Sequence, residues 1–162
     1  MKVEVATNIG LSDQEREGVL NILGLLLADE YVVYTKTRSY HWNVVGPQFN
    51  DLHRFFQAQY EDLNEVVDEV AERARTLGGW ALGTLGEFLQ NTRLEERPGE
   101  YADARTMIAA LLEDHEAIIR TLRTDADACD EKYHDMGTND FLIGLMERHE
   151  KMAWMLRAFL AG

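Results

Sequence analysis

Two histidines and two acidic residues in the first half of the chain have the chemistry of metal ligands. His41 and His53 lie on either side of a break at Gly46-Pro47. Asp68 and Glu72 follow on the helix that is predicted to start after this break. At 100° per residue, Asp68 lies about 60° and Glu72 about 100° from His53, so the three side chains share one helix face. Imidazole nitrogen and carboxylate oxygen suit iron, and zinc or manganese can compete for them.

One chain cannot bring these ligands to a single ion. His53 and Asp68 are fifteen residues apart, which is about 22 Å along a helix, whereas ligands must sit within about 2.5 Å of the metal. An antiparallel copy of the helix, related by a twofold axis near Asp62 and Leu63, would place Asp68 and Glu72 of one subunit opposite His53 of the other. Twofold contacts are the commonest in homo-oligomers, so the spacing predicts a site shared by two subunits.

Further motifs extend this pattern over most of the chain. They are His41-Trp42-Asn43, Gly46-Pro47, Phe49, His53, Asp68, Ala71-Glu72-Arg73-Ala74, Leu77-Gly78-Gly79, Asp114-His115-Glu116, Ile118-Ile119-Arg120, Thr138-Asn139-Asp140, His149-Glu150-Lys151 and Trp154. Together they resemble the signature of the miniferritins, the family named DNA-binding protein from starved cells (Dps). In that family the subunit is a four-helix bundle, twelve subunits form a hollow shell, and an iron-oxidising site lies at each twofold interface. The resemblance implies that His41 and His53 of one subunit and Asp68 and Glu72 of its partner are the ligands.

Gln57 is the position at which the sequence departs from that family, which normally has a carboxylate one turn after the second histidine. A glutamine amide is a neutral and weaker ligand, so we expect one metal position to be held less tightly. Gln57 could ligate through its carbonyl oxygen or through a water, and Glu61 one turn on could contribute. Alternatively, Gln57 could only form a hydrogen bond there.

The acidic segment in the last third of the chain holds weaker candidates. Glu131-x-x-His134 matches one Glu-x-x-His element of di-iron bundles, but a site inside one bundle needs two such elements and the second is missing. By analogy with the acidic threefold channels of the family, Glu131, Asp135 and Asp140 are interpreted as iron-entry residues. The alternative is an acidic turn that is merely solvated.

The remaining histidines and the single cysteine are interpreted as structural residues. For His115 and His149, a surface or structural role is favoured over direct metal ligation. Cys129 is the only cysteine, which excludes an intrachain disulfide, and we expect it to be a small buried apolar residue. For Trp42, beside His41, a packing role is favoured, and electron donation close to iron is the alternative.

Four long stretches with apolar residues at three- and four-residue steps predict helices. They run from a capping box at Ser12 to about Asn43, from Pro47 to Gly78-Gly79, from near Asp103, and from Thr138 as N-cap. Between Ala126 and Gly137 the pattern lapses, and a short apolar piece from Leu85 to Leu89 predicts a short crossing helix. The predicted fold class is all-α, a ferritin-like four-helix bundle with a short extra helix in the long connection between helices two and three.

Length and composition fit a single domain covering residues 1–162. Hydrophobic residues make up 46% of the chain, enough for a sizeable core. The sequence has no run of about 18 apolar residues. The N-terminal residues also lack the basic and apolar parts of a secretory signal. We therefore expect no membrane span and a cytoplasmic protein.

The chain is acidic, with 29 acidic and 16 basic residues and a formal charge of −13. This charge favours cations and repels nucleic acid. Family members that compact DNA usually carry Lys and Arg on a flexible terminal tail. Here the segment before Ser12 has one cation, Lys2, offset by Glu4, and Ala161-Gly162 directly follow the fourth predicted helix. DNA affinity comes mainly from such cations, so we expect no appreciable DNA binding.

The resemblance implies a ferroxidase, an oxidoreductase that acts on metal ions. Such a protein oxidises Fe(II), in this family usually with hydrogen peroxide, and stores ferric oxide inside a shell of twelve subunits. Removing both reagents of hydroxyl-radical production would protect against oxidative damage. A DNA-compacting structural protein of the same family is the alternative, and a metal-free or zinc-bound structural shell is a third function class.

Overall fold

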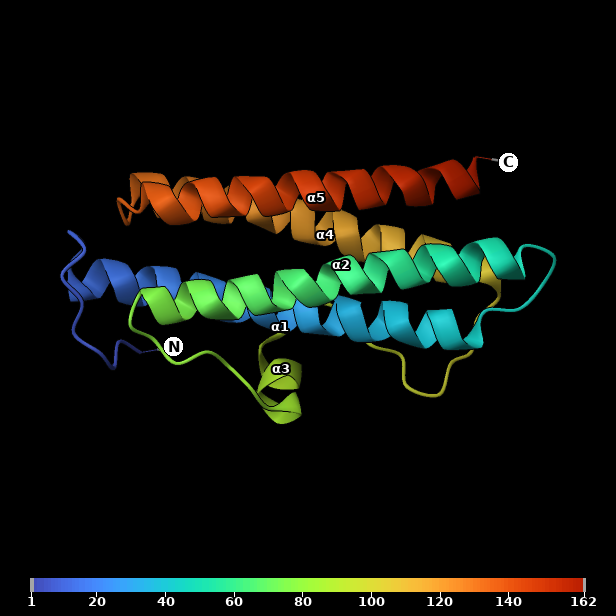
Figure 1. Ribbon diagram of the computed structural model, residues 1–162, viewed down its shortest axis with the longest axis horizontal. Coiled ribbons are helices and arrows are strands. Elements are labelled where there is room, and N and C mark those ends of the chain that lie inside the picture. The colour runs from blue at the N-terminus through green and yellow to red at the C-terminus, as the bar shows by residue number, and fades with distance from the viewer. Residues whose placement is uncertain (1, 162) are drawn as a thin grey trace.

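The computed structural model describes residues 2–161, which form five helices and no strands. The four long helices are α1 (Asp13–Asn43), α2 (Phe49–Thr76), α4 (Ala104–Glu131) and α5 (Met136–Leu160), and the short helix α3 spans Leu85–Asn91. In Figure 1, α1 lies beside α2 and α4 beside α5, and the two pairs stack into a bundle. Helix α3 lies against α1 on the outside of the bundle. The predicted fold class is confirmed.

Local side-chain bonds determine where most helices begin. Ser12 and Glu15 form a reciprocal capping box at the start of α1, as predicted, and Thr84 and Glu87 form another at α3. Asp103 caps α4 by accepting a hydrogen bond from the backbone nitrogen of Thr106 at 2.8 Å. Such caps satisfy backbone N–H groups that a helix start leaves unpaired.

The boundary between α4 and α5 differs from the sequence prediction. The sequence predicts Thr138 as the cap of the last helix, but Asp135 caps it, and Oδ1 of Asp135 accepts a hydrogen bond from the backbone nitrogen of Thr138 at 3.0 Å. Aspartate is a better N-cap than threonine, which accounts for the earlier start. The lapse of the helical pattern predicted between Ala126 and Gly137 is shorter than expected, because α4 continues to Glu131 and only residues 132–135 are not helical. Ala126 and Cys129 are buried there, so small residues continue the apolar stripe.

The core lies between the four long helices. Its largest fully buried side chains come from all four: Leu20, Leu23, Leu26, Leu27, Phe56, Leu52, Leu63, Met107, Leu111, Ile118 and Leu122, with Leu142 and Leu156 from α5. Among the described helices, α1 alone contains a stretch that is long and apolar enough to cross a membrane by length and composition. Because 61% of that stretch is buried in the bundle, its role as a core helix accounts for this composition.

The residues before α1 are bound to the end of α2. The backbone nitrogens of Glu4 and Val5 donate to the carbonyl oxygen of Gly78 at 2.9 and 3.1 Å, and Arg16 donates to the carbonyl oxygens of Val5 and Leu77. Gly78 has φ 82°, and a Cβ there would lie 2.5 Å from the oxygen of Val5. Only glycine therefore fits this contact without strain. We call residues 3–7 the N-terminal strap.

Candidate metal centre

The break between α1 and α2 brings His41 and His53 together. His41 lies in the last turn of α1 and His53 in the second turn of α2. Nδ1 of His41 lies 2.7 Å from the backbone oxygen of His53, and Nδ1 of His53 lies 2.8 Å from the backbone oxygen of His41. The ring centroids are 3.8 Å apart with 20° between the planes. Two of the predicted ligands are thus adjacent within one chain.

The reciprocal bonds determine which ring nitrogens are available to a metal. A backbone carbonyl oxygen can only accept, so Nδ1 of both His41 and His53 must carry a hydrogen. In the neutral imidazole the lone pair is then on Nε2. A hydrogen bond from the non-ligating nitrogen is what orients metal-bound histidines and fixes their tautomer. Both side chains are therefore prepared to bind a metal through Nε2.

Aromatic rings restrict the movement of the two imidazoles. Phe49 stacks on His53 with centroids 5.1 Å apart, and Tyr60 meets His41 edge-on at 5.2 Å. His41 is only 8% exposed. Rings packed in this way keep few rotamers, so binding a metal requires little further ordering of the ligands.

Trp42 does not pack into its own bundle, so the packing role favoured from the sequence stays a prediction. Its side chain is 64% exposed, and the guanidinium of Arg38 lies 5.3 Å from its ring centroid. Val45 and Phe49 in the same break are also exposed. Leucines of α3 show the same feature, with Leu85 68% and Leu89 60% exposed. Exposed large apolar side chains in such number are typical of surfaces that contact another protein.

The two carboxylates of the predicted site stay away from the histidines within one chain. Asp68 and Glu72 are exposed on α2, which runs without interruption from Phe49 to Thr76. Across residues 2–161, no group of three or more His, Cys, Asp and Glu side chains converges in a way that could hold a metal ion. The histidine pair and the carboxylate pair therefore lie on separate parts of the subunit surface.

Gln57 lies between these two parts and is half-buried. Its side-chain nitrogen Nε2 donates a hydrogen bond to Oε1 of Glu61 at 2.8 Å. Glu61 is exposed one turn further along α2. The side chain at the position that departs from the family pattern is thus held by a neighbouring carboxylate.

The three predicted iron-entry residues differ in their surroundings. Asp135 is 5% exposed and is the N-cap of α5. Its carboxylate also forms an ion pair with Arg73 at 3.1 Å. Glu131 and Asp140 are exposed at the end of α4 and the start of α5. His134 lies beyond the end of α4 with φ 54°. The Glu131-x-x-His134 element is therefore not helical, and its two side chains do not have the spacing that a di-iron bundle uses.

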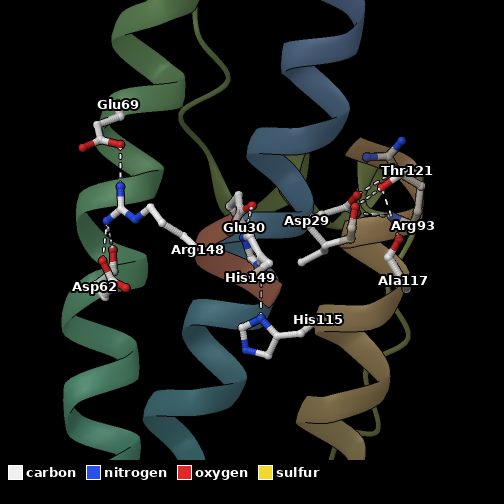
Figure 2. A network of polar contacts seen from close by, with 11 residues as sticks. Asp29, Glu30, Asp62, Glu69, Arg93, His115, Ala117, Thr121, Arg148 and His149 are labelled. Atoms are coloured by element: carbon white, nitrogen blue, oxygen red, sulfur yellow. Dashed lines mark hydrogen bonds and ion pairs between the residues drawn. The ribbon is translucent and has the colours of Figure 1, made fainter. Parts of the chain in front are cut away.

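A buried polar chain crosses the centre of the bundle (Figure 2). Nε2 of His149 lies 2.9 Å from Oε1 of Glu30, and Nδ1 of His149 lies 2.8 Å from Nδ1 of His115. All three side chains have no exposed surface. Burial lowers the pKa of His115 well below its ordinary value, and the neighbouring His149 adds to this effect. The two histidines are structural core residues, one of the two roles favoured from the sequence.

The buried chain does not form a metal site, because His149 separates Glu30 from His115. Oε2 of Glu30 and Nε2 of His115, at opposite ends of the chain, have no partner. Sequence reasoning did not single out Glu30. Its signal was present, however, since Asp29-Glu30 interrupts the apolar run of α1, where an acidic residue needs a buried partner.

An ion network fixes α2 against α5 on another side of the bundle (Figure 2). Arg148 of α5 bonds to Glu69 at 2.8 Å and to Asp62, and it lies 3.7 Å from Glu65. One cation therefore serves three carboxylates of α2. The excess negative charge on this helix favours cations near it.

Cys129 is buried and unpaired, as expected. Burial raises the pKa of its thiol to about 12, with Asp135 and Asp125 adding to the effect. The thiolate is the reactive form of cysteine, so this residue is inert at neutral pH.

Comparison with known proteins places these features in context. The family model of the ferritin-like domain matches residues 20–162. An uncharacterized low temperature-induced protein of Nostoc sp. is 50% identical over 155 residues, covering 96% of this chain and 87% of that protein. DNA protection during starvation protein 2 of Bacillus anthracis is 36% identical over 143 residues, covering 88% of this chain and 96% of that protein.

Solved structures of Dps proteins are also similar to this chain over nearly its whole length. DpsC from Streptomyces coelicolor superposes with a TM-score of 0.95 at 30% identity, covering 99% of this chain and 93% of that chain. The Dps protein of Vibrio cholerae O1, described as a member of a broad superfamily of ferritin-like diiron-carboxylate proteins, superposes with a TM-score of 0.89 at 31% identity. That comparison covers 97% of this chain and 98% of the other.

Proposed function

Because the chain belongs to the Dps family of ferritin-like proteins, we propose that it is a ferroxidase that oxidises Fe(II) and stores the ferric product. The observation that carries this proposal is the reciprocal bonding of His41 and His53. Each ring donates from Nδ1 to the other residue's carbonyl oxygen, which leaves both Nε2 atoms for a metal.

The remaining ligands come from a second subunit. Asp68 and Glu72 are exposed on α2 and have the i, i+4 spacing that places both on one helix face. An antiparallel copy of α2 brings them opposite His53 of the first chain. The exposed apolar residues of the break and of α3, among them Trp42 and Leu85, support a face that is covered by this copy. Repetition of such contacts builds a closed homo-oligomer, for which we propose twelve subunits around a hollow centre.

Iron is the substrate of the proposed reaction. Two Fe(II) ions each lose one electron, and one hydrogen peroxide molecule accepts both, its O–O bond breaking to give two hydroxide ions. Carboxylates such as Asp68 and Glu72 stabilise the ferric product because a hard cation prefers anionic oxygen ligands. Zinc and manganese compete for the same nitrogen and oxygen atoms. Consuming Fe(II) and peroxide together removes both sources of hydroxyl radicals, which would protect a cytoplasm under oxidative stress.

The charge of the chain supports capture of iron. With a net charge of −13 per chain, the assembled protein attracts Fe(II) over a distance set by ionic strength. Exposed Glu131 and Asp140 remain proposed iron-entry residues. Asp135 is the weakest of the three candidates for an iron-entry residue, because its buried carboxylate is already paired with Arg73.

A DNA-compacting role is the second candidate, and it rests only on the name of relatives such as DNA protection during starvation protein 2. Within the described residues, the N-terminal strap is bonded to Gly78 and is not a free basic arm. Together with the negative charge, this favours iron chemistry over compaction.

The test is an anaerobic titration with Fe(II), followed by hydrogen peroxide. We expect Fe(II) to bind, one peroxide to be consumed for about two Fe(II), and the ferric product to elute with the assembled protein. A His41→Ala/His53→Ala variant should bind less Fe(II) than the wild type. In its presence, Fe(II) should be oxidised no faster than free Fe(II) in buffer. Equal rates for this variant and the wild type would refute the proposal.

A further inference from the structure

Gln57 and Glu61 are joined by a hydrogen bond on the face of α2 that carries the proposed ligands. Nε2 of Gln57 lies 2.8 Å from Oε1 of Glu61. Counted around the helix from His53, Gln57 lies at about 40°, Asp68 at about 60° and Glu61 at about 80°. The bonded pair is therefore part of the same surface as the histidine and the carboxylate.

The bond determines the orientation of the Gln57 amide. An ionised carboxylate offers only acceptor atoms, so Gln57 can bond to Glu61 only through its NH₂ group. The carbonyl oxygen Oε1 then points to the opposite side of the amide, away from Glu61. This oxygen is also the amide atom that binds metal ions in proteins.

We propose that Glu61 is a positioning residue for one metal position of the shared centre, an inference that rests on the function proposed above. Its carboxylate holds the Gln57 amide with Oε1 toward the metal. It also supplies, from behind the ligand, the negative charge that Gln57 lacks. Partners that orient a ligating side chain in this way typically contribute about 10- to 100-fold to metal affinity.

The proposed twofold arrangement supplies the second metal position with ligands from both subunits. Gln57 and Asp68 are equally far from the axis near Asp62 and Leu63, so Gln57 lies opposite Asp68 of the partner subunit. One ion between them would contact a carboxylate of the partner and the amide oxygen of Gln57. Glu61 would stay one layer behind the amide and make no direct bond to the ion.

The pair also explains how the site tolerates a neutral residue where the family has a carboxylate. Exchange of the contacting group for an amide removes one negative charge from the ligand atoms. Glu61 carries a negative charge about one helical turn from Gln57, which compensates for that loss. We therefore expect the first metal position, held by the histidines, to be independent of Glu61, and the second to depend on it.

Anaerobic titration with Co(II) tests this role, because Co(II) accepts the same nitrogen and oxygen ligands and is not oxidised under these conditions. Calorimetry and the visible absorption of Co(II) report equivalents bound per subunit and their affinities, and gel filtration reports assembly. The variants are Glu61→Ala, Glu61→Gln, Gln57→Ala and the double variant Gln57→Asp/Glu61→Gln. Glu65→Gln is the matched control, since Glu65 is an exposed carboxylate one turn further along α2 that contacts Arg148.

We expect Glu61→Ala, Glu61→Gln and Gln57→Ala each to weaken the second equivalent by about 10-fold or more, with the first equivalent and assembly unchanged. The double variant should recover most of the affinity, because the carboxylate introduced at position 57 would bring the charge to the ligand itself, and Glu65→Gln should behave as the wild type. Wild-type affinity in both Glu61 variants would overturn the inference. So would a Gln57→Ala variant that keeps the second equivalent while Glu61→Gln loses it, since Glu61 would then be a direct ligand.

Failure of the proposed function would look different. If the wild type bound no Co(II), or if His53→Ala bound both equivalents as tightly as the wild type, the metal centre itself would be wrong. If His53→Ala lost binding while the Glu61 variants kept both equivalents, only the role of Glu61 would fall.

Discussion

Nδ1 of His115 lies 2.8 Å from Nδ1 of His149 in the centre of the bundle, where neither ring has any exposed surface. In such a contact one nitrogen must donate and the other must accept, so the two facing nitrogens cannot both carry a proton. Burial already holds the pKa of His115 well below its ordinary value of 6.5. The core therefore keeps His115 neutral under conditions in which an unfolded chain would protonate it.

This relationship predicts a loss of stability in mild acid. As pH falls below 6.5, the unfolded chain binds a proton at His115 and the folded chain does not, so stability decreases until pH reaches the folded pKa. The slope is at most about 1.4 kcal/mol per pH unit for each subunit. In a His115→Gln variant this contribution is absent. The wild type should exceed the variant in Tm by more at pH 7.5 than at pH 5.5, as measured by calorimetry.

The matched control for this experiment is His134→Asn. His134 is exposed and has φ 54°, a backbone conformation that asparagine also accepts. This variant keeps His115 and His149 in the core, so it should lose stability in acid as the wild type does. A wild-type advantage over His115→Gln that stays constant or widens in acid would contradict the assignment of His115 as a buried neutral residue.

Complementation between defective subunits tests whether the metal centre is shared. His53→Ala subunits and Asp68→Ala/Glu72→Ala subunits should each be inactive alone, because every site lacks one set of ligands. A mixed dimer contains one intact site and one doubly defective site. Random co-assembly at equal amounts should therefore restore about a quarter of the wild-type rate of Fe(II) oxidation.

Each parent, denatured and reassembled by itself, is the control for that mixture. The rate should also peak at equal proportions of the two subunits. Mixtures no faster than either parent would show that the ligands belong to one chain, and the proposed twofold site would be abandoned.

Gln57→Asp should tighten the second metal position. The substitution replaces a neutral amide oxygen by an anionic one at the same place on α2, so we expect at least about a tenfold gain in affinity, or about 1.4 kcal/mol. Anaerobic Fe(II) titration measures it. A Gln57→Leu variant, which has no ligand atom, is the control and should lose the second equivalent. Unchanged affinity in both variants would place residue 57 outside the coordination sphere.

We expect no appreciable binding of DNA. The net charge of −13 opposes a polyanion, and the N-terminal strap, with Lys2 before it, is bonded to the carbonyl oxygen of Gly78. A gel-shift experiment at neutral pH and low salt, where attraction is least screened, should leave DNA free even in large protein excess. A shift that disappears on adding salt would show that cations are gathered on the outer surface and would support compaction.

Patterns close together in the sequence were enough to predict most of the architecture. The predicted capping box at Ser12 and the apolar steps of three and four residues depend on contacts within a turn or two. For this reason the bounds of α1 and α2, the short helix α3 and the start of α4 after Asp103 agree with their predictions. The shared helix face of His53, Asp68 and Glu72 follows from helical geometry alone, and an uninterrupted α2 confirms that they share one helix.

Contacts between distant segments had to come from the tertiary structure. Glu30 meets His149 across 119 residues of sequence, and the sequence could not indicate that these two residues would satisfy each other in the core. Asp135 is acidic, as a residue of an iron channel would be, but its carboxylate pairs with Arg73 and caps the start of α5. The orientation of His41 and His53 depends on how α2 packs back on α1. Helical periodicity thus determined which residues share a face, while packing, which sets the partner and the protonation of each polar atom, decided what those residues can do.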